Sequence, residues 1–253
     1  MDNRQLIDDG FILHRYPYRD TSLILDCFLQ NHGRIHCVAK GVRTERSSRK
    51  GLLQAFSPLH LMMTGKSALK TLTNVESSGL PTQLIGMPLM CAWYINELLV
   101  RLCPKEEPHQ HLYFSYRAAL LALEMAPPDT RQHDCSKALR LFEKHLLSAL
   151  GYALPLKEEA RSHRAILYDH WYQFIPEHGL VLTTREDRID SFLGEDIQAI
   201  QHDQYNNTRV LAAAKRLMRL ALTPLLGGRP LKTRELWHEK NNWINMQNKN
   251  IEL

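Results

Sequence analysis

The hydrophobic period of the sequence changes near residue 80. Before that point, short runs rich in Ile, Leu, Val, Thr and Phe alternate with turn residues, which is typical of β-strands joined by tight connections. The expected strands cover residues 11–14, 22–30, 34–39, 59–63 and 69–75. Five strands at this spacing predict a small barrel or sandwich.

From about residue 88, apolar residues recur with helical spacing. The expected helices cover residues 89–102, 112–125, 137–150 and 209–222, with stops at Pro104, Pro127, Gly151 and Pro224. The chain is therefore expected to be α+β, with a domain at residues 1–80 and a mainly helical domain at residues 81–253. A small β-hairpin is expected within the helical part around residues 165–185, from strands at 166–168, 171–175 and 180–182.

Composition and motifs argue against several classes of function. With 44% hydrophobic and 23% charged residues, the chain is typical of globular proteins rather than disordered ones. Its five cysteines form no Cys-x-x-Cys pair, so we expect no zinc site and no other cofactor. Cys27 and Cys37 are symmetric about His32, so we expect them opposite each other on paired strands. No catalytic motif stands out, and we expect a protein that is not an enzyme.

No segment of the sequence predicts export or membrane insertion. Asp8 and Asp9 interrupt the N-terminal region with charge, and the long uncharged stretch at residues 77–96 contains Gly and Pro. We therefore expect a cytoplasmic, nucleoid-associated protein with no membrane partner.

Positive charge is concentrated between residues 34 and 50. This segment contains six basic residues and one acidic residue, Glu45, so its net charge of +5 equals that of the whole chain. A glycine-bounded loop at residues 41–51 carries most of them, with hydroxyl side chains between, and such a loop suits phosphate oxygens. Tyr16 and Tyr18 add aromatic faces for unpaired bases. The candidate DNA-binding residues are Arg34, Lys40, Arg43, Arg46, Arg49 and Lys50.

Two of the expected helices have a basic side opposite their apolar side. In the helix at 137–150 this side carries Lys137, Arg140 and Lys144. In the helix at 209–222 it carries Arg209, Lys215, Arg216 and Arg219. The helical period places both sides toward solvent.

Several short blocks of the sequence stand out together. They are Val38-Ala-Lys-Gly-Val-Arg43 with Lys50-Gly51, Lys70-Thr-Leu72, Tyr94-Ile-Asn-Glu-Leu-Leu99, Leu150-Gly-Tyr152, and Leu226-Gly-Gly-Arg-Pro-Leu-Lys-Thr-Arg-Glu-Leu236. In this order and spacing they resemble the RecO family of bacterial DNA repair proteins. The similarity runs from about residue 8 to residue 237, and the block that begins at Tyr94 and the last block are the most specific.

The resemblance implies an N-terminal five-stranded OB-fold barrel followed by a helical domain. It implies a recombination mediator that binds single- and double-stranded DNA, anneals complementary strands and works with RecR to help RecA replace single-strand-binding protein. Many relatives carry a four-cysteine zinc module, but the matching region here, roughly residues 155–185, has no cysteine. The chain therefore resembles the zinc-free branch.

Family members also bind the acidic C-terminal tail of single-strand-binding protein in the helical domain. Such a tail needs an apolar slot with a cationic rim. The residues expected to form this rim, with Arg140 first, are Arg140, Lys144, Lys215, Arg216 and Arg219.

Three alternatives to this reading remain open. An RNA-binding module of similar design is the main one, because nothing in the sequence indicates recognition of a 2′-hydroxyl. A histidine-assisted nuclease would cleave strands in the presence of divalent metal. A scaffold that binds only proteins would not shift oligonucleotides at low salt.

Overall fold

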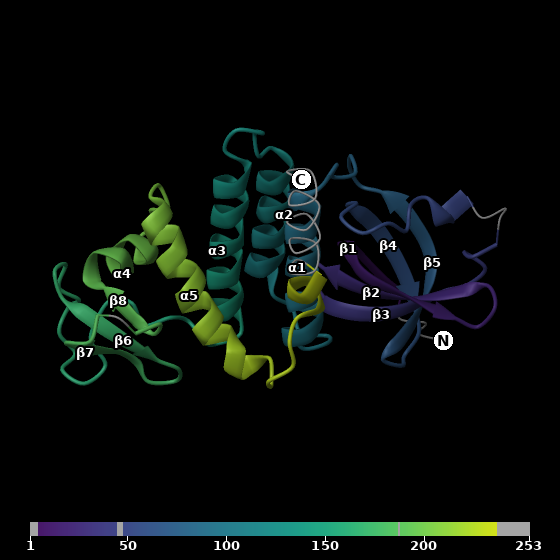
Figure 1. Cartoon of the computed structure of the whole chain (residues 1–253). Helices are drawn as coiled ribbons and strands as arrows, with labels where there is room; N and C mark the ends of the chain where they lie inside the picture. The colour runs from purple at the N-terminus through teal and green to yellow at the C-terminus, as the bar shows by residue number, and fades with distance from the viewer. Residues whose placement is uncertain (1–4, 45–47, 187, 237–253) are drawn as a thin grey trace. The chain divides into compact units, whose positions relative to one another are not determined.

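The computed structural model describes residues 5–44, 48–186 and 188–236, and it shows a β-barrel, helices and a small second sheet (Figure 1). The chain divides into two compact units. The first comprises Met1–Met125 and Leu231–Leu253, and the second comprises Ala126–Pro230. Within the described residues, no helix combines the length and hydropathy needed to span a membrane.

The first unit contains a closed five-stranded barrel, as predicted. Its neighbours run in the order β1-β2-β3-β5-β4, and every pairing is antiparallel except that of β3 with β5. β1 is long enough to pair with β2 along its second half and with β4 along its first half, which closes the barrel. The strands are β1 (Gln5–Tyr18), β2 (Ser22–Leu29), β3 (Gly33–Ala39), β4 (Leu59–Thr64) and β5 (Leu69–Ser77).

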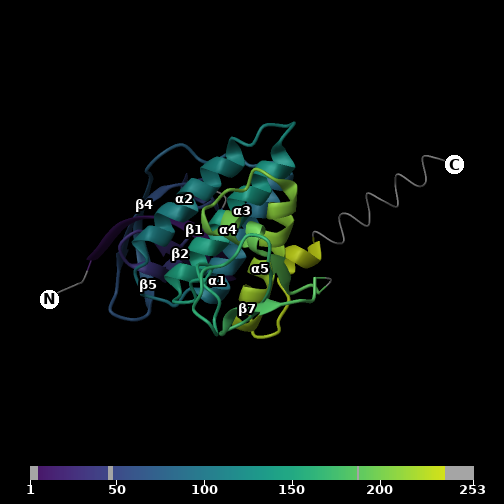
Figure 2. The same ribbon diagram turned by 90° about the vertical axis from the view of Figure 1, so that its left-hand side faces the viewer.

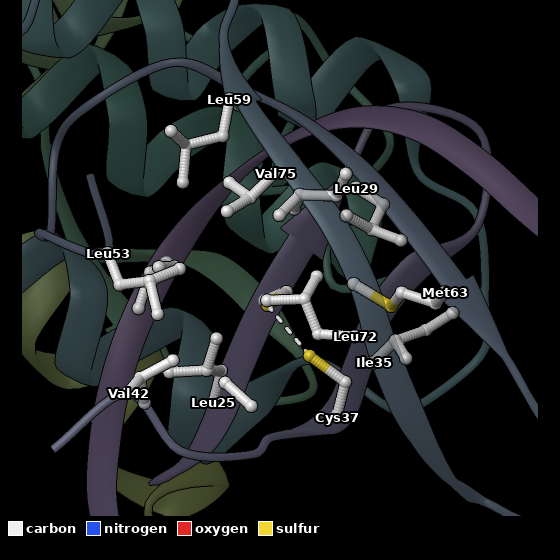
Figure 3. Close-up of a cluster of buried hydrophobic side chains, with 14 residues drawn as sticks. Leu25, Leu29, Ile35, Cys37, Val42, Leu53, Leu59, Met63, Leu72 and Val75 are labelled. Carbon is white, nitrogen blue, oxygen red and sulfur yellow. Dashed lines mark hydrogen bonds between the residues drawn. The ribbon is translucent and has the colours of Figure 1, made fainter. Parts of the chain in front are cut away.

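Alternate side chains of the strands fill the barrel interior (Figure 3). Both cysteines of the β2–β3 hairpin point inward, but they are not opposite each other as expected. Cys27 pairs with Ile35, and Leu25 pairs with Cys37, because the hairpin is centred on residue 31 rather than on His32. The two thiols are therefore diagonal neighbours, with their Sγ atoms 3.9 Å apart.

The helices α1 (Met87–Leu102) and α2 (Gln110–Glu124) pack on the barrel within the same unit. The buried Asn96 of α1 donates from Nδ2 to the backbone oxygen of Leu13 at 3.0 Å, and it accepts from the Tyr116 hydroxyl at 2.8 Å. The Tyr116 ring also packs edge-on against Phe11, with the centroids 5.1 Å apart. The sequence boundary near residue 80 marks the change from strands to helices, whereas the compact units separate after Met125. As a boundary between independently folding domains, residue 80 stays a prediction.

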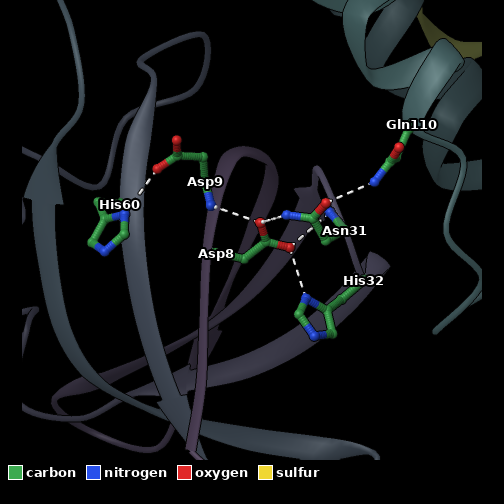
Figure 4. Close-up of polar contacts among 6 residues, drawn as sticks. All are labelled: Asp8, Asp9, Asn31, His32, His60 and Gln110. Carbon is green, nitrogen blue, oxygen red and sulfur yellow. Dashed lines mark hydrogen bonds and ion pairs between the residues drawn. The ribbon is translucent and has the colours of Figure 1, made fainter.

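The turn between β2 and β3 is fixed to both β1 and α2 (Figure 4). The carboxylate of Asp8 accepts a hydrogen bond from the backbone N–H of Asn31 at 2.8 Å, and His32 Nδ1 lies 2.7 Å from the same oxygen. Gln110 donates to the Asn31 side chain at 2.8 Å. Gly33 follows with φ of 67°, and a Cβ there would lie 1.9 Å from a backbone oxygen of Glu107. Only glycine fits this approach.

The second unit consists of three helices and a three-stranded sheet of order β7-β6-β8. α5 packs against α3 and α4 (Figure 2). The expected hairpin is present as β6 and β7, although residues 166–168 are not a strand. β8 and α4 were not expected, because three and eight residues are too short to show a clear period. The elements are α3 (Arg131–Ala149), β6 (Trp171–Ile175), β7 (Gly179–Thr183), β8 (Ser191–Leu193), α4 (Gly194–Gln201) and α5 (Thr208–Leu225).

Candidate nucleic-acid interface

The loop that follows β3 carries exposed cations beside the β1–β2 turn. Lys40 and Arg43 are exposed, and Val42 between them is fully buried in the barrel core. The backbone N–H of Arg43 donates to Thr21 O at 2.9 Å, and its guanidinium Nη1 donates to Arg19 O at 3.0 Å. The first part of the loop is therefore held against the hairpin turn, with its charges toward solvent.

The far end of the same loop is also anchored. Residues Ser48–Lys50 form a short 3-10 turn, in which Arg49 is half-buried and Lys50 is exposed. Leu53, which follows, is fully buried, and its backbone oxygen accepts from Arg15 Nη1 at 2.9 Å. The expected contact at Arg46 lies outside the described residues. The described ends of this loop are thus fixed to the barrel rather than free.

Arg34 does not belong to this exposed set, contrary to expectation. Its side chain is 11% exposed, and its guanidinium donates two hydrogen bonds to Asp26, from Nε at 2.9 Å and from Nη2 at 2.8 Å. Its Nη1 donates to Cys103 O at 3.1 Å. Asp26 is fully buried, and a buried carboxylate needs such a partner. Arg34 therefore stabilises the barrel. The cluster of basic residues in the sequence could not show whether Arg34 pairs with a buried acid or faces solvent.

Arg19 joins the exposed cations, although it lies outside the basic run at residues 34–50. It occupies the β1–β2 turn with φ of 51°, and its guanidinium carbon lies 5.2 Å from the centroid of the Tyr18 ring. The barrel topology brings this turn to Arg43. The sequence alone did not indicate this, because Arg19 and Arg43 are more than twenty residues apart and only the folded barrel brings them together.

The basic side of α3 is not a solvent face, and this expectation is wrong for Arg140. Arg140 is 6% exposed and forms a two-point ion pair with the buried Glu143, with Nε and Nη2 each 2.8 Å from a carboxylate oxygen. Lys144 donates to the backbone oxygens of Ile200 and Gln201 at 3.0 and 2.8 Å, and it pairs with Asp203 at 2.7 Å. It thereby caps the carbonyl end of α4.

The basic side of α5 is only partly exposed. Arg216 lies over the Phe192 ring at 4.9 Å and donates to Ser191 O at 3.3 Å. Lys215 and Arg219 are exposed. Helical period alone could not reveal this division, because the covering elements, β8 and α4, are themselves too short to predict.

The five cysteines are buried free thiols. Burial raises the pKa of Cys103 to about 12, and the contact with Cys37 together with burial raises the pKa of Cys27 well above its usual value. A thiol reacts as its thiolate, so neither is suited to nucleophilic chemistry. Among the described residues, no group of three or more His, Cys, Asp or Glu side chains is placed to hold a metal ion.

Comparison with known proteins covers nearly the whole chain. The family described as recombination protein O N terminal matches residues 1–80, and the family described as recombination protein O C terminal matches residues 88–235. A DNA repair protein RecO from Coxiella burnetii (strain RSA 493 / Nine Mile phase I) is 40% identical over 236 residues, which is 93% of this chain and 99% of that protein. The RecO protein of Aliivibrio fischeri (strain ATCC 700601 / ES114) is 40% identical over 90% of this chain and 93% of its own length. The RecO protein of Burkholderia pseudomallei (strain 1710b) is 39% identical over 90% of this chain and 81% of its own length. With both family domains present in order and relatives matched along almost their full length, the chain belongs to the RecO family of DNA repair and recombination proteins.

Proposed function

We propose that this protein is a recombination mediator that binds single- and double-stranded DNA, anneals complementary strands and works with RecR to help RecA replace single-strand-binding protein. Membership of the RecO family supports the mediator role. The observation that carries DNA binding is the set of exposed cations on the β1–β2 turn and on the loop after β3, formed by Arg19, Lys40, Arg43 and Lys50. Such a protein acts on chromosomal DNA, so we place it at the nucleoid. No covalent step is part of the proposal.

The cations act by replacing the counterions of the DNA backbone. Each phosphate that a cation neutralises releases counterions, so the affinity falls as salt rises. Arg43 and Lys50 stand on the loop whose ends are anchored by the buried Val42 and Leu53, which limits the entropy lost on binding. Contacts of this kind position a strand without reading its sequence, as a mediator acting on any damaged DNA requires.

Annealing follows if both units carry such charge. Complementary strands repel each other through their phosphates, and cations on two surfaces screen both strands together. The barrel supplies the first set. In the second unit, Lys215 and Arg219 are exposed on α5 and supply the second.

The same exposed pair is proposed to meet the acidic tail of single-strand-binding protein. Lys215 and Arg219 are both exposed, so their charges can pair with a carboxylate of the tail. Arg140, Lys144 and Arg216 would each have to exchange Glu143, Asp203 or Ser191 for the tail. Replacing Lys215 and Arg219 by Glu should therefore weaken binding of a tail peptide, while the affinity of the barrel for a naked single strand stays the same. Equal loss of both would contradict this assignment.

The decisive experiment measures annealing of complementary strands coated with the cognate single-strand-binding protein, either intact or lacking its tail. We expect annealing with the intact coat and much slower annealing without the tail. The triple variant Lys40→Gln, Arg43→Gln, Lys50→Gln should lose annealing on naked strands. Its charge-matched control replaces Lys157, Arg161 and Arg164, which are exposed in the second unit, and should keep it.

Three results would reject the proposal. The first is wild-type protein that leaves oligonucleotides unbound at low salt, which would favour a scaffold that binds only proteins. The second is tighter binding to a matched RNA than to DNA, which would favour an RNA-binding module. The third is strand cleavage with magnesium or manganese.

A further inference from the structure

The outer face of β1 changes in character along its length. The bulge between Ile12 and His14 resets the alternation of the strand, so that His14, Tyr16 and Tyr18 share one face. Their partners on β2 are Asp26, Ile24 and Ser22. Arg15, between them, is opposite the core residue Leu25, which shows that the three rings lie on the outside of the barrel.

Aromatic residues on this part of the barrel divide into covered and uncovered groups. Phe11 and Phe28 are 3% and 1% exposed, because Tyr113 and Tyr116 of α2 pack over them. Tyr16 is 39% exposed, and His14 is exposed too. Their rings stack on each other with centroids 4.3 Å apart and planes inclined by 35°. The uncovered pair is therefore an ordered aromatic surface open to solvent.

Cations stand at the end of this aromatic row. Tyr18 is two residues beyond Tyr16 and lies beneath the guanidinium of Arg19. Arg43 donates to the backbone oxygen of Arg19, so two exposed guanidinium groups adjoin the row. Rings followed by cations suit a single nucleic-acid strand, whose bases stack on aromatic faces while its phosphates pair with positive charge.

We propose that His14 and Tyr16 form a stacking platform for unpaired bases, through which the barrel binds single-stranded DNA more tightly than duplex DNA. The proposal rests on the DNA binding proposed above and adds the chemical group that the barrel recognises besides phosphate. In a duplex, each base is already stacked between its neighbours, so the platform has no free base face to contact. The cations serve both kinds of DNA, whereas the rings serve only the single strand.

The test compares Tyr16→Leu, which removes the ring but keeps apolar bulk, with Tyr16→Phe, which keeps the ring. Three probes are used with the full-length protein: a single-stranded oligothymidine, the same strand with abasic sites, and a duplex of equal length. Tyr16→Leu should lose about tenfold in affinity for the oligothymidine, with little change for the other two probes. Tyr16→Phe should bind all three as the wild type does.

Salt dependence separates stacking from charge. The logarithmic slope of affinity against salt reports the number of phosphate contacts, so Tyr16→Leu should leave the slope unchanged. His14→Leu provides a second variant at an exposed position and should show a smaller loss of the same kind. Phe114→Leu removes a ring that is 49% exposed on α2 and should leave all three affinities unchanged.

Two results would overturn the platform while leaving DNA binding in place. One is wild-type affinity of both Tyr16→Leu and His14→Leu for the oligothymidine. The other is an equal loss for the oligothymidine, the abasic strand and the duplex, which would assign the effect to the barrel structure. Failure of the wild-type protein to bind any of the probes would instead reject the proposed function, and the platform with it.

Discussion

The carboxylate of Glu97 on α1 caps the helical turn that contains Thr233. One oxygen accepts the backbone N–H of Lys232 at 2.8 Å, and the other accepts the N–H and the hydroxyl of Thr233 at 2.9 and 2.7 Å. Next to this cap, the Arg234 guanidinium lies over the Tyr94 ring at 5.6 Å. The two most specific blocks of the sequence resemblance thus contact each other, and they return the end of the described chain to the first unit.

Replacing Glu97 by Gln should lower the free energy of unfolding by about 2 kcal/mol, because hydrogen bonds to a charged group and a helix cap are both weakened. Thr233→Val should cost about 1 kcal/mol, since the backbone N–H remains. Urea denaturation of the single and double variants measures the coupling. The double variant should lose less unfolding free energy than the sum of the single variants, because both changes affect the same hydrogen bond, from the Thr233 hydroxyl to Glu97.

Glu235→Gln provides the matched control for this cap. Glu235 is exposed one residue beyond Arg234, so the change should alter stability by less than about 0.5 kcal/mol. Strict additivity of Glu97→Gln and Thr233→Val would show that the two groups do not act together.

Removing one side of the Arg140–Glu143 ion pair should destabilise the second unit strongly. Both residues are buried, and Arg140→Ala would leave a buried carboxylate without its guanidinium, at a cost of about 3–5 kcal/mol. Thermal unfolding followed by circular dichroism measures the loss. The joint change Arg140→Met, Glu143→Leu should restore most of the stability, because it removes both charges. A fully stable Arg140→Ala would contradict the buried pair.

Much of the barrel could be predicted from the sequence, because each strand has one face in the interior and alternation makes that face visible. The hairpin register could not be predicted. Moving the centre of the turn by one residue shifts the strand pairing by two residues, so Cys27 and Cys37 stay on the inner face in either register. Burial pattern alone does not tell a direct pair from a diagonal pair.

The candidate sites were less predictable than the fold. Charge on a sequence run does not reveal whether a buried acid lies across the sheet, and Asp26 turns Arg34 into a structural residue. Likewise, the basic side of a helix is exposed only if no other element covers it. α4 and β8 engage Lys144 and Arg216, and neither element is long enough to predict by period.

Acid should weaken the second unit through Asp190. Hydrogen bonds from Arg188, with a further one from Gln173, hold the pKa of Asp190 at about 2, below the value near 4 expected in the unfolded chain. Because the folded pKa is the lower one, ionised Asp190 stabilises the protein above about pH 4, and this contribution disappears as the pH falls toward 2.

The variant Asp190→Asn isolates this contribution. The wild type should exceed it by about 1 kcal/mol in unfolding free energy between pH 5 and 7, a modest figure because the pair is near the surface. The difference should shrink toward zero between about pH 4 and pH 2. A difference that does not depend on pH would show that the Asp190 charge is not involved.

Arg34 and Arg43 belong to the same basic run, but replacing Arg34 should affect stability, whereas replacing Arg43 should affect DNA binding. Arg34→Gln should lower the unfolding free energy by about 3 kcal/mol, because the buried Asp26 loses a two-point partner and keeps His36, whose Nε2 lies 3.0 Å away.

Arg43→Gln removes an exposed side chain and should change stability by less than about 0.5 kcal/mol. It should instead reduce the salt slope of single-strand binding by about 0.7, the amount expected for one lost phosphate contact. Arg34→Gln, measured at a temperature where it stays folded, should keep the wild-type slope, because its guanidinium is directed at Asp26 and Cys103 rather than at solvent. Fluorescence anisotropy of a labelled strand across a salt series, paired with urea denaturation, gives both quantities for each variant. If Arg34→Gln flattens the slope and Arg43→Gln does not, the DNA contacts lie on the Arg34 side of the barrel and not at the β1–β2 turn.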